Sequence, residues 1–279
     1  MIRKEDYEEP RCLLSLGKQT HDDDTPIQMI PVSRIIDKLD HLLNQNNYHE
    51  AERLLLYWEQ EAKTLKDQKG QLTITNELVG LYRKLGNKDK VLVYTNICLE
   101  LLTSLDLGVT FSVATTYLNI GTAYKFLNEN EKALNYYRLV ENMYTKTLPS
   151  NDYNWAGLYN NMGIAMMSLK HYDEALKVFN QALAILDDKP QHKIDQAITY
   201  LNIADLYELK LGLIDGSNLI DKAINEALKI LNDQNITRDG YYAFVCEKCE
   251  TVLRYYGYFR DASEIKERAQ NIYERNRTI

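Results

Sequence analysis

Residues 156–187 read AGLYNNMGIAMMSLKHYDEALKVFNQALAILD, and this stretch decides the fold. In its first half apolar side chains recur at three- and four-residue steps, from Leu158 through Met162 to Leu169. The second half repeats the same spacing, which is typical of an amphipathic helix. The stretch therefore predicts two helices joined by a short turn.

Small residues in this stretch mark a pattern that runs along the chain. Ala175, which lies twelve residues after Gly163, has counterparts at steps of 40 to 45 residues. The six markers are Ala51, Val91, Ala133, Ala175, Ile220 and Ala262. The fifth repeat carries an insertion of four residues around residues 211–216. One hairpin cannot bury its apolar face alone, so the pattern predicts about six stacked helical hairpins.

The markers resemble those of the tetratricopeptide repeat (TPR), a hairpin of two helices whose usual period is 34 residues. The period here is about 42 residues, so each hairpin is longer by about two helical turns. Such long repeats are similar to those of the kinesin light chain type and of the bacterial peptide receptors of the Rap and PlcR type. The resemblance covers residues 32 to about 276. It implies an all-α, TPR-like right-handed superhelical solenoid.

The domain organisation follows from the extent of the repeats. Residues 1–31 contain three of the five prolines and the acidic run at residues 22–24, so we expect a partly ordered N-terminal arm. Residues 32–279 are expected to form the solenoid, with repeats starting near residues 32, 72, 114, 156, 197 and 243. The many charged residues of 261–277 predict a solvent-facing C-terminal capping helix.

The composition argues against several classes of function. Thirty-three basic and 40 acidic residues give a formal net charge of −7, which is unfavourable for binding nucleic acid. No run of about 18 apolar residues is present, so no membrane span is expected. The N-terminal residues lack the apolar core of a signal peptide, and the four cysteines do not suggest a disulfide framework. We therefore expect a cytoplasmic protein with neither nucleic acid nor membrane as a partner.

The clearest functional signal is a series of asparagines. Asn119, Asn161 and Asn202 occupy one position of the repeat, at steps of 42 and 41 residues, and Asn76 and Asn160 lie one residue away from that position. Asparagine is a mediocre residue inside a helix. A row of side-chain amides could bind the backbone of an extended peptide whatever its sequence. The resemblance places these residues on the first helix of each hairpin, which lines the concave side in that family. The alternative is structural, with each asparagine bridging to the next repeat.

Three basic residues accompany this row. Arg83, Lys84 and Lys125 lie in repeats two and three, whereas acidic residues gather in repeat five. A ligand with a negative group directed towards repeats two and three would suit this polarity. The alternative interpretation is an ordinary solvated face.

Two other patterns are interpreted as packing. Tyr117, Tyr159 and Tyr200 recur two residues before the asparagines, and we expect their rings to pack between the two helices of each hairpin. Cys246 and Cys249 form a CxxC pair, but a zinc site needs four ligands and no second pair stands at a suitable spacing. We expect both thiols to be buried in the core.

No catalytic motif, metal site or cofactor site is found in the sequence, so no enzyme activity is expected. The preferred hypothesis is a protein- or peptide-binding adaptor or scaffold that uses the groove of the superhelix. Its predicted contacts are Asn76, Asn119, Asn160, Asn161, Asn202, Arg83, Lys84 and Lys125. One alternative is a peptide-sensing regulator of the Rap/PlcR type without a DNA-binding domain. Another is a self-associating structural subunit, with a homodimer as the simplest form.

Overall fold

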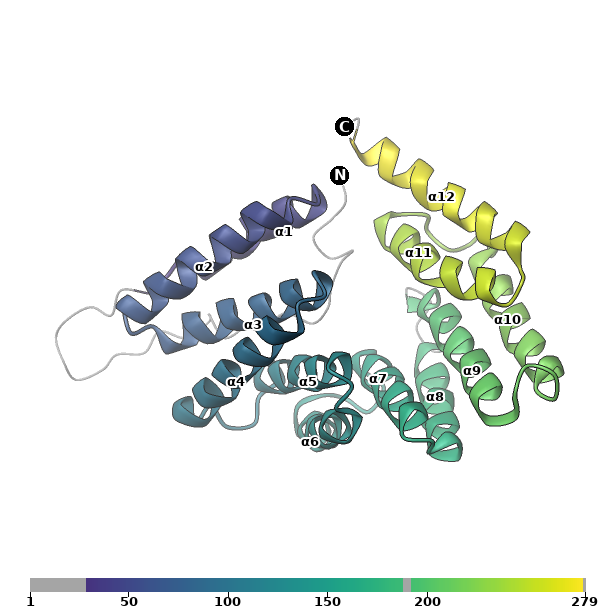
Figure 1. Cartoon of the computed structure of the whole chain (residues 1–279), viewed down its shortest axis with the longest axis horizontal. Helices are drawn as coiled ribbons and strands as arrows, with labels where there is room; N and C mark the ends of the chain where they lie inside the picture. The colour runs from purple at the N-terminus through teal and green to yellow at the C-terminus, as the bar shows by residue number, and fades with distance from the viewer. Residues whose placement is uncertain (1–28, 188–191, 278–279) are drawn as a thin grey trace. The chain divides into compact units, whose positions relative to one another are not determined.

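The computed structural model describes residues 29–187 and 192–277, which form twelve helices and no strand (Figure 1). The helices are α1 (Val32–Asn44), α2 (Tyr48–Thr64), α3 (Gln68–Lys84), α4 (Lys88–Leu105), α5 (Phe111–Phe126), α6 (Asn130–Thr147), α7 (Asn154–Ser168), α8 (Tyr172–Asp187), α9 (Asp195–Leu211), α10 (Ser217–Leu231), α11 (Gly240–Tyr255) and α12 (Phe259–Arg277). The prediction of an all-α fold with six helical hairpins is confirmed. Each predicted repeat start lies within four residues of the first residue of α1, α3, α5, α7, α9 or α11.

The described residues divide into two compact units, an N-terminal unit of residues 29–148 and a C-terminal unit of residues 149–277. The first contains α1 to α6, and the second contains α7 to α12. Most of the predicted N-terminal arm lies outside the described residues, so the division between arm and solenoid stays a prediction. Each unit is considered by itself below.

The hairpins close through short turns that share one backbone feature. Outside the α9–α10 hairpin, the turns within the described hairpins are three residues long, and their middle residue has a positive φ. These middle residues are Asn46, Gly86, Asn128, Lys170 and Gly257. In the second repeat the next residue, Asn87, accepts a hydrogen bond from the backbone N–H of Lys90 at 3.1 Å and so caps α4.

The insertion in the fifth repeat lengthens both a helix and a turn. Helix α9 continues seven residues past Ala204, whereas α7 continues five past Gly163. The turn between α9 and α10 comprises residues 212–216, which is two residues more than in the other hairpins. The four inserted residues are therefore divided equally between the helix and the turn.

Helix packing inside a hairpin depends on a glycine that faces an aromatic ring. A Cβ atom on Gly163 of α7 would lie 2.4 Å from Cε1 of Phe179 in α8, and one on Gly121 of α5 would lie 2.6 Å from Cε1 of Tyr137 in α6. Both rings are fully buried. In repeat two the first helix has Val79 in place of the glycine, and the second helix has the smaller Thr95 in place of the aromatic residue. A larger side chain on one helix is therefore matched by a smaller one on the other, which keeps the interior closely packed.

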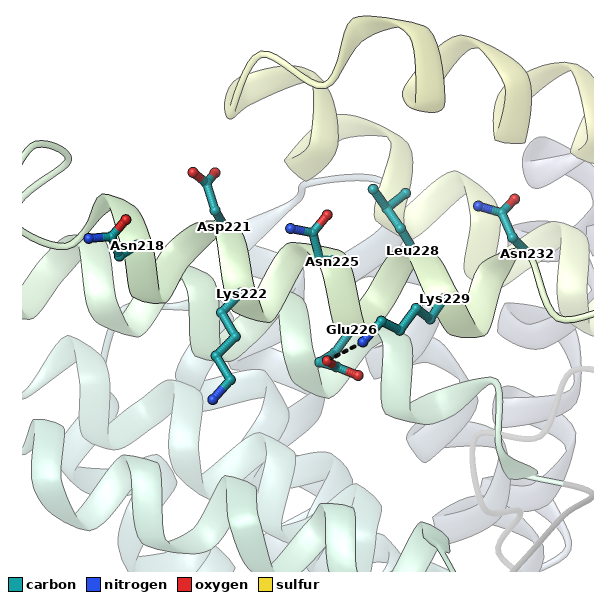
Figure 2. A pocket seen from close by; sticks show the side chains of 8 residues that line it. All are labelled: Asn218, Asp221, Lys222, Asn225, Glu226, Leu228, Lys229 and Asn232. Atoms are coloured by element: carbon teal, nitrogen blue, oxygen red, sulfur yellow. Dashed lines mark hydrogen bonds and ion pairs between the residues drawn. The ribbon is translucent and has the colours of Figure 1, made fainter.

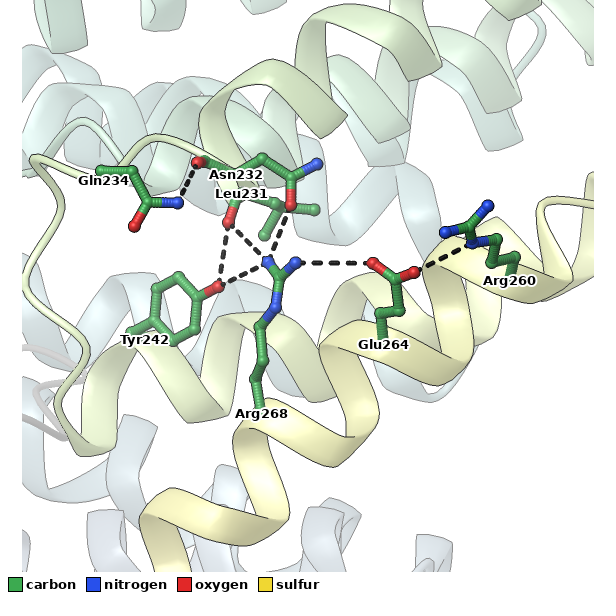
Figure 3. Close-up of polar contacts among 7 residues, drawn as sticks. All are labelled: Leu231, Asn232, Gln234, Tyr242, Arg260, Glu264 and Arg268. Atoms are coloured by element: carbon green, nitrogen blue, oxygen red, sulfur yellow. Dashed lines mark hydrogen bonds and ion pairs between the residues drawn. The ribbon is translucent and has the colours of Figure 1, made fainter.

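Helix α12 is fixed to the preceding hairpin by Arg268 (Figure 3). The guanidinium of Arg268 donates to the backbone carbonyl of Leu231 at 3.2 Å and to Oδ1 of Asn232 at 2.8 Å. Because the last carbonyls of α10 carry the negative end of the helix dipole, a cation stabilises this end. The same guanidinium lies 3.6 Å from Oε2 of Glu264, on its own helix.

The first-helix face as candidate binding site

The candidate site lies on the surface that the first helices of neighbouring repeats form within each unit, which we call the first-helix face of that unit. In the N-terminal unit α3 contacts both α1 and α5, and in the C-terminal unit α9 contacts both α7 and α11. All eight predicted contact residues lie on α3, α5, α7 or α9. Because these helices are adjacent within each unit, side chains at equivalent positions can meet across repeats.

In the N-terminal unit the asparagines form a pair between repeats. The side-chain N–H of Asn119 on α5 donates to Oδ1 of Asn76 on α3 at 3.2 Å. Asn76 is only 5% exposed, whereas Asn119 is half-buried. The pair therefore stabilises the packing of α3 against α5, and Asn119 is the member that a ligand could reach.

The C-terminal unit contains a second pair with the same geometry. The side-chain N–H of Asn202 on α9 donates to Oδ1 of Asn160 on α7 at 3.3 Å. Asn160 in turn donates to the hydroxyl of Thr199 at 2.9 Å. Asn161, the next residue on α7, is half-buried and also takes part in an interaction within the protein.

These pairs explain why two asparagines lie one residue away from the main series. Asn76 and Asn160 are the hydrogen-bond acceptors for the residues 43 and 42 positions further on. The structural role that the sequence left open is thus present in both units. The recurrence of asparagine at separations of 42 and 43 residues marks the candidates in the sequence, but it does not specify which of them are hydrogen-bonded.

The three basic residues lie at the C-terminal ends of first helices. Arg83 and Lys84 are in the last turn of α3, and Lys125 is in the last turn of α5. The Lys84 ammonium lies 5.2 Å from the centre of the Tyr48 ring, which is a cation–π contact. A cation in the last turn also stabilises a helix through its dipole. Arg83 and Lys125 are half-buried and already take part in interactions within the protein.

The first-helix face of the C-terminal unit also contains carboxylate–tyrosine pairs that the sequence analysis did not find. The hydroxyl of Tyr256, which follows α11, lies 2.9 Å from Oδ1 of Asp205 and 2.7 Å from Oε2 of Glu208, both on α9, and these two carboxyl oxygens share its single proton. The hydroxyl of Tyr255 donates to Oε1 of Glu208 at 2.5 Å. Burial raises the pKa of the Asp205 carboxyl, and the Tyr256 hydrogen bond opposes that shift.

Asp195 makes a further contact of this kind. Its carboxylate, whose side chain is 20% exposed, accepts a hydrogen bond from the Tyr241 hydroxyl and lies 3.9 Å from Nδ1 of His192. Burial raises the pKa of Asp195 to about 6, although the Tyr241 hydrogen bond favours the charged form. A carboxyl with this pKa changes its charge in mildly acidic solution.

The packing interpretation of the repeated tyrosines is confirmed for two of them. The Tyr117 ring stacks on Tyr136 of α6 with ring centres 6.0 Å apart. Tyr159 packs against the cluster of Ala156, Ala182 and Leu186, which joins α7 to α8. Such rings add buried area between the helices of a hairpin.

The CxxC pair is also structural. Cys246 and Cys249 are fully buried free thiols, and burial raises the pKa of Cys246 to about 11. Within the described ranges no group of three His, Cys, Asp or Glu side chains could hold a metal ion. No helix among the described residues is long and apolar enough to cross a membrane.

The surface also has hollows outside the first-helix face. One hollow, of about 780 Å³, lies along α10. Figure 2 shows the side chains that line it, most of which are polar. Its lining residues are Asn218, Asp221, Lys222, Asn225, Glu226, Leu228, Lys229 and Asn232. Because they all lie along one second helix and its end, this hollow shares no residue with the asparagine pairs. Asn225 is exposed and provides a useful control position.

Comparisons with known proteins agree with the helical-hairpin fold. Models of the tetratricopeptide repeat match residues 114–146 and 156–189. No curated protein matches the chain at a significant level.

Three solved structures illustrate the similarity of fold. A Rap protein complexed with competence and sporulation factor is 14% identical with a TM-score of 0.52, over 88% of this chain and 75% of the other. The apo form of RapI is 16% identical with a TM-score of 0.51, over 88% and 66%. A single-substitution variant of the kinesin light chain TPR-like repeats from Podospora anserina is 14% identical with a TM-score of 0.50, over 74% and 95%. The repeat matches show that the chain contains tetratricopeptide repeats at residues 114–146 and 156–189, and the twelve helices of the described residues form a TPR-like solenoid fold.

Proposed function

We propose that the chain is a protein-interaction adaptor that binds an extended peptide or protein segment on its first-helix face. The observation that supports this is one oriented, half-buried amide in each unit, that of Asn119 in the N-terminal unit and that of Asn202 in the C-terminal unit. A side-chain amide has two N–H donors and a carbonyl oxygen that can accept two hydrogen bonds. Each of these two residues donates one N–H to its neighbour, so donor and acceptor capacity remains for a ligand.

The hydrogen bonds between repeats favour binding because they orient the amides beforehand. An amide that is free to rotate would lose about 0.5–1.5 kcal/mol of entropy when a ligand immobilised it. The bonds to Asn76 and Asn160 have already restricted this rotation. An extended backbone offers a donor and an acceptor in each residue other than proline, so oriented amides can bind it without reading its sequence.

Charge would set the orientation of the ligand. On the N-terminal unit the proposed contacts include Arg83, Lys84 and Lys125, of which Lys84 is exposed. A carboxylate or another negative group of the ligand would be attracted there. Asn161 is proposed as a further contact in the C-terminal unit, next to the Asn160–Asn202 pair.

Selection of random peptides tests the proposal without requiring the natural partner. Short peptides from a phage-displayed library would be selected on the immobilised full chain, and their affinities measured by fluorescence anisotropy. Asn119→Ala should weaken binding to the N-terminal unit, and Asn202→Ala binding to the C-terminal unit, each at least about tenfold, which corresponds to about 1.4 kcal/mol. Asn225→Ala, on the outer surface of α10, should leave binding unchanged.

Stability must be measured in parallel because Asn202→Ala also removes a hydrogen bond to Asn160, which contributes about 1 kcal/mol. Binding is therefore compared at a temperature where circular dichroism shows every variant to be fully folded. Equal affinities for the wild type and Asn202→Ala would contradict the proposal. Failure to select any peptide would do so as well.

A further inference from the structure

The inserted turn of the fifth repeat exposes apolar side chains instead of burying them. Ile214 is 88% exposed and Leu213 is 53% exposed, and Leu209 and Leu211 at the end of α9 are also exposed. The equivalent turn between α1 and α2 consists of Gln45, Asn46 and Asn47. Exposed residues of this kind are unfavourable in water unless another surface covers them.

The neighbouring turn extends this apolar surface. Tyr255 and Phe259 flank the turn between α11 and α12, and both are exposed. The Tyr255 hydroxyl donates to Glu208 at 2.5 Å, and the Tyr258 hydroxyl donates to Asp221 at 2.8 Å. These bonds hold the α11–α12 turn beside the ends of α9 and α10 that carry the inserted turn.

Together these side chains form what we call the turn patch of the C-terminal unit. Its members are Leu209, Leu211, Leu213, Ile214, Leu219, Tyr255 and Phe259. Their exposed surface is on the order of 700 Å², close to the roughly 800 Å² that each partner contributes to a standard interface.

The charges beside the patch have both signs. Asp215 follows Ile214 in the inserted turn, is exposed, and forms no ion pair or hydrogen bond within the described chain. Arg260 follows Phe259, and its side chain is 91% exposed and pairs with Glu264 on its own helix. One turn thus carries an exposed acid next to apolar residues, and the other carries an exposed base.

We propose that the turn patch binds the same patch of a second copy of this chain, forming a two-fold symmetric dimer. In such an interface residue i of one copy contacts residue j of the other, and j contacts i. Asp215 of each copy then pairs with Arg260 of the other, on either side of a shared apolar centre. The presence of both signs favours a second copy over a partner with charges of one sign. The turn patch shares Tyr255 with the first-helix face but contains none of the paired asparagines, so the variants that test dimerisation differ from those that test peptide binding.

Sedimentation velocity of the full chain over a range of concentrations tests the proposal. The wild type should sediment as a dimer, and Leu213→Asp or Ile214→Asp should raise the dissociation constant at least about a hundredfold by placing a charge in the apolar centre. Val93→Asp is the matched control, because Val93 lies in the N-terminal unit and is 53% exposed, as Leu213 is. This control variant should dimerise like the wild type.

A charge exchange tests the two-fold pairing. Asp215→Arg and Arg260→Asp should each weaken the dimer about tenfold, since each places like charges opposite each other in both symmetric contacts. The double variant Asp215→Arg/Arg260→Asp restores opposite charges and should regain the wild-type dissociation constant. These side chains are exposed, so loss of folding is not expected, and circular dichroism would verify this.

Several results would overturn the proposal. A wild-type chain that stays monomeric at the highest concentration would leave the patch to a different protein partner. A dimer that Ile214→Asp does not weaken must use another surface. A double charge variant weaker than both single variants would contradict the pairing of Asp215 with Arg260.

Discussion

Gly163 provides the most direct test of how the hairpins are packed. Adding a methyl group in Gly163→Ala would bring Cβ to within 2.4 Å of Cε1 and 2.5 Å of Cζ in the fully buried Phe179 ring. Carbon atoms without a bond between them prefer a separation of about 3.5–4.0 Å, so the ring or α8 must move by about 1 Å. Overpacking of this kind costs about 1–3 kcal/mol.

The same helix contains a matched control. Gly157 is exposed on α7, and a Cβ atom there would meet nothing within 4 Å. Gly157→Ala should therefore stabilise the protein by about 1 kcal/mol, because alanine favours the helix over glycine by that amount. Gly163→Ala gains the same helix propensity but also incurs the packing cost. The two variants should therefore differ by about 1–3 kcal/mol, with Gly163→Ala the less stable.

A second substitution should relieve the crowding. Repeat one has Leu55 at the position of Phe179, so Phe179→Leu is compatible with the fold. Phe179→Leu should lower the free energy of unfolding by less in the Gly163→Ala background than in the wild type. The difference between the two losses is the coupling energy of the pair.

Hydrogen exchange is the appropriate assay because a repeat protein need not unfold in one step. Exchange of peptides from residues 154–187, measured by mass spectrometry, reports the local stability of this hairpin directly. Urea unfolding followed by circular dichroism gives the global value. Equal stabilisation by Gly157→Ala and Gly163→Ala would refute the close approach of α7 and α8.

Two further predictions concern buried polar groups. Thr95 is fully buried and its hydroxyl has no hydrogen-bond partner among the described residues, so Thr95→Val should raise the free energy of unfolding by about 1 kcal/mol in urea titrations. Thr115→Val should give no such gain, because the Thr115 hydroxyl donates to the Phe111 carbonyl at 3.0 Å. For Asp195, the folded-state pKa of about 6 lies above its usual value of 3.8, so the folded form binds the proton more tightly and stability falls as pH rises from about 4 to 6. This loss of stability amounts to at most about 3 kcal/mol, and Asp195→Asn should remove it. If the pH profile of urea unfolding is the same in Asp195→Asn as in the wild type, this account is wrong.

The sequence by itself predicted the helices, their pairing into hairpins and the site of the insertion. These features follow from local rules, since apolar side chains at three- and four-residue steps place one face of a helix against its neighbour. The sequence also indicated that the two helices of a hairpin approach closely at Gly121 and Gly163, because each of these glycines lies twelve residues before a marker alanine. The burial of Cys246 followed from the same spacing.

Only the tertiary structure decided which residues meet between repeats. The pairing of Asn119 with Asn76, and of Tyr256 with Asp205, depends on how each first helix is rotated and shifted against the next. A periodic sequence does not specify this rotation, because a shift of one residue turns a side chain by about 100° around the helix axis. For the same reason the sequence located the inserted turn, while its exposed Ile214 became evident only when the neighbouring helices were in place.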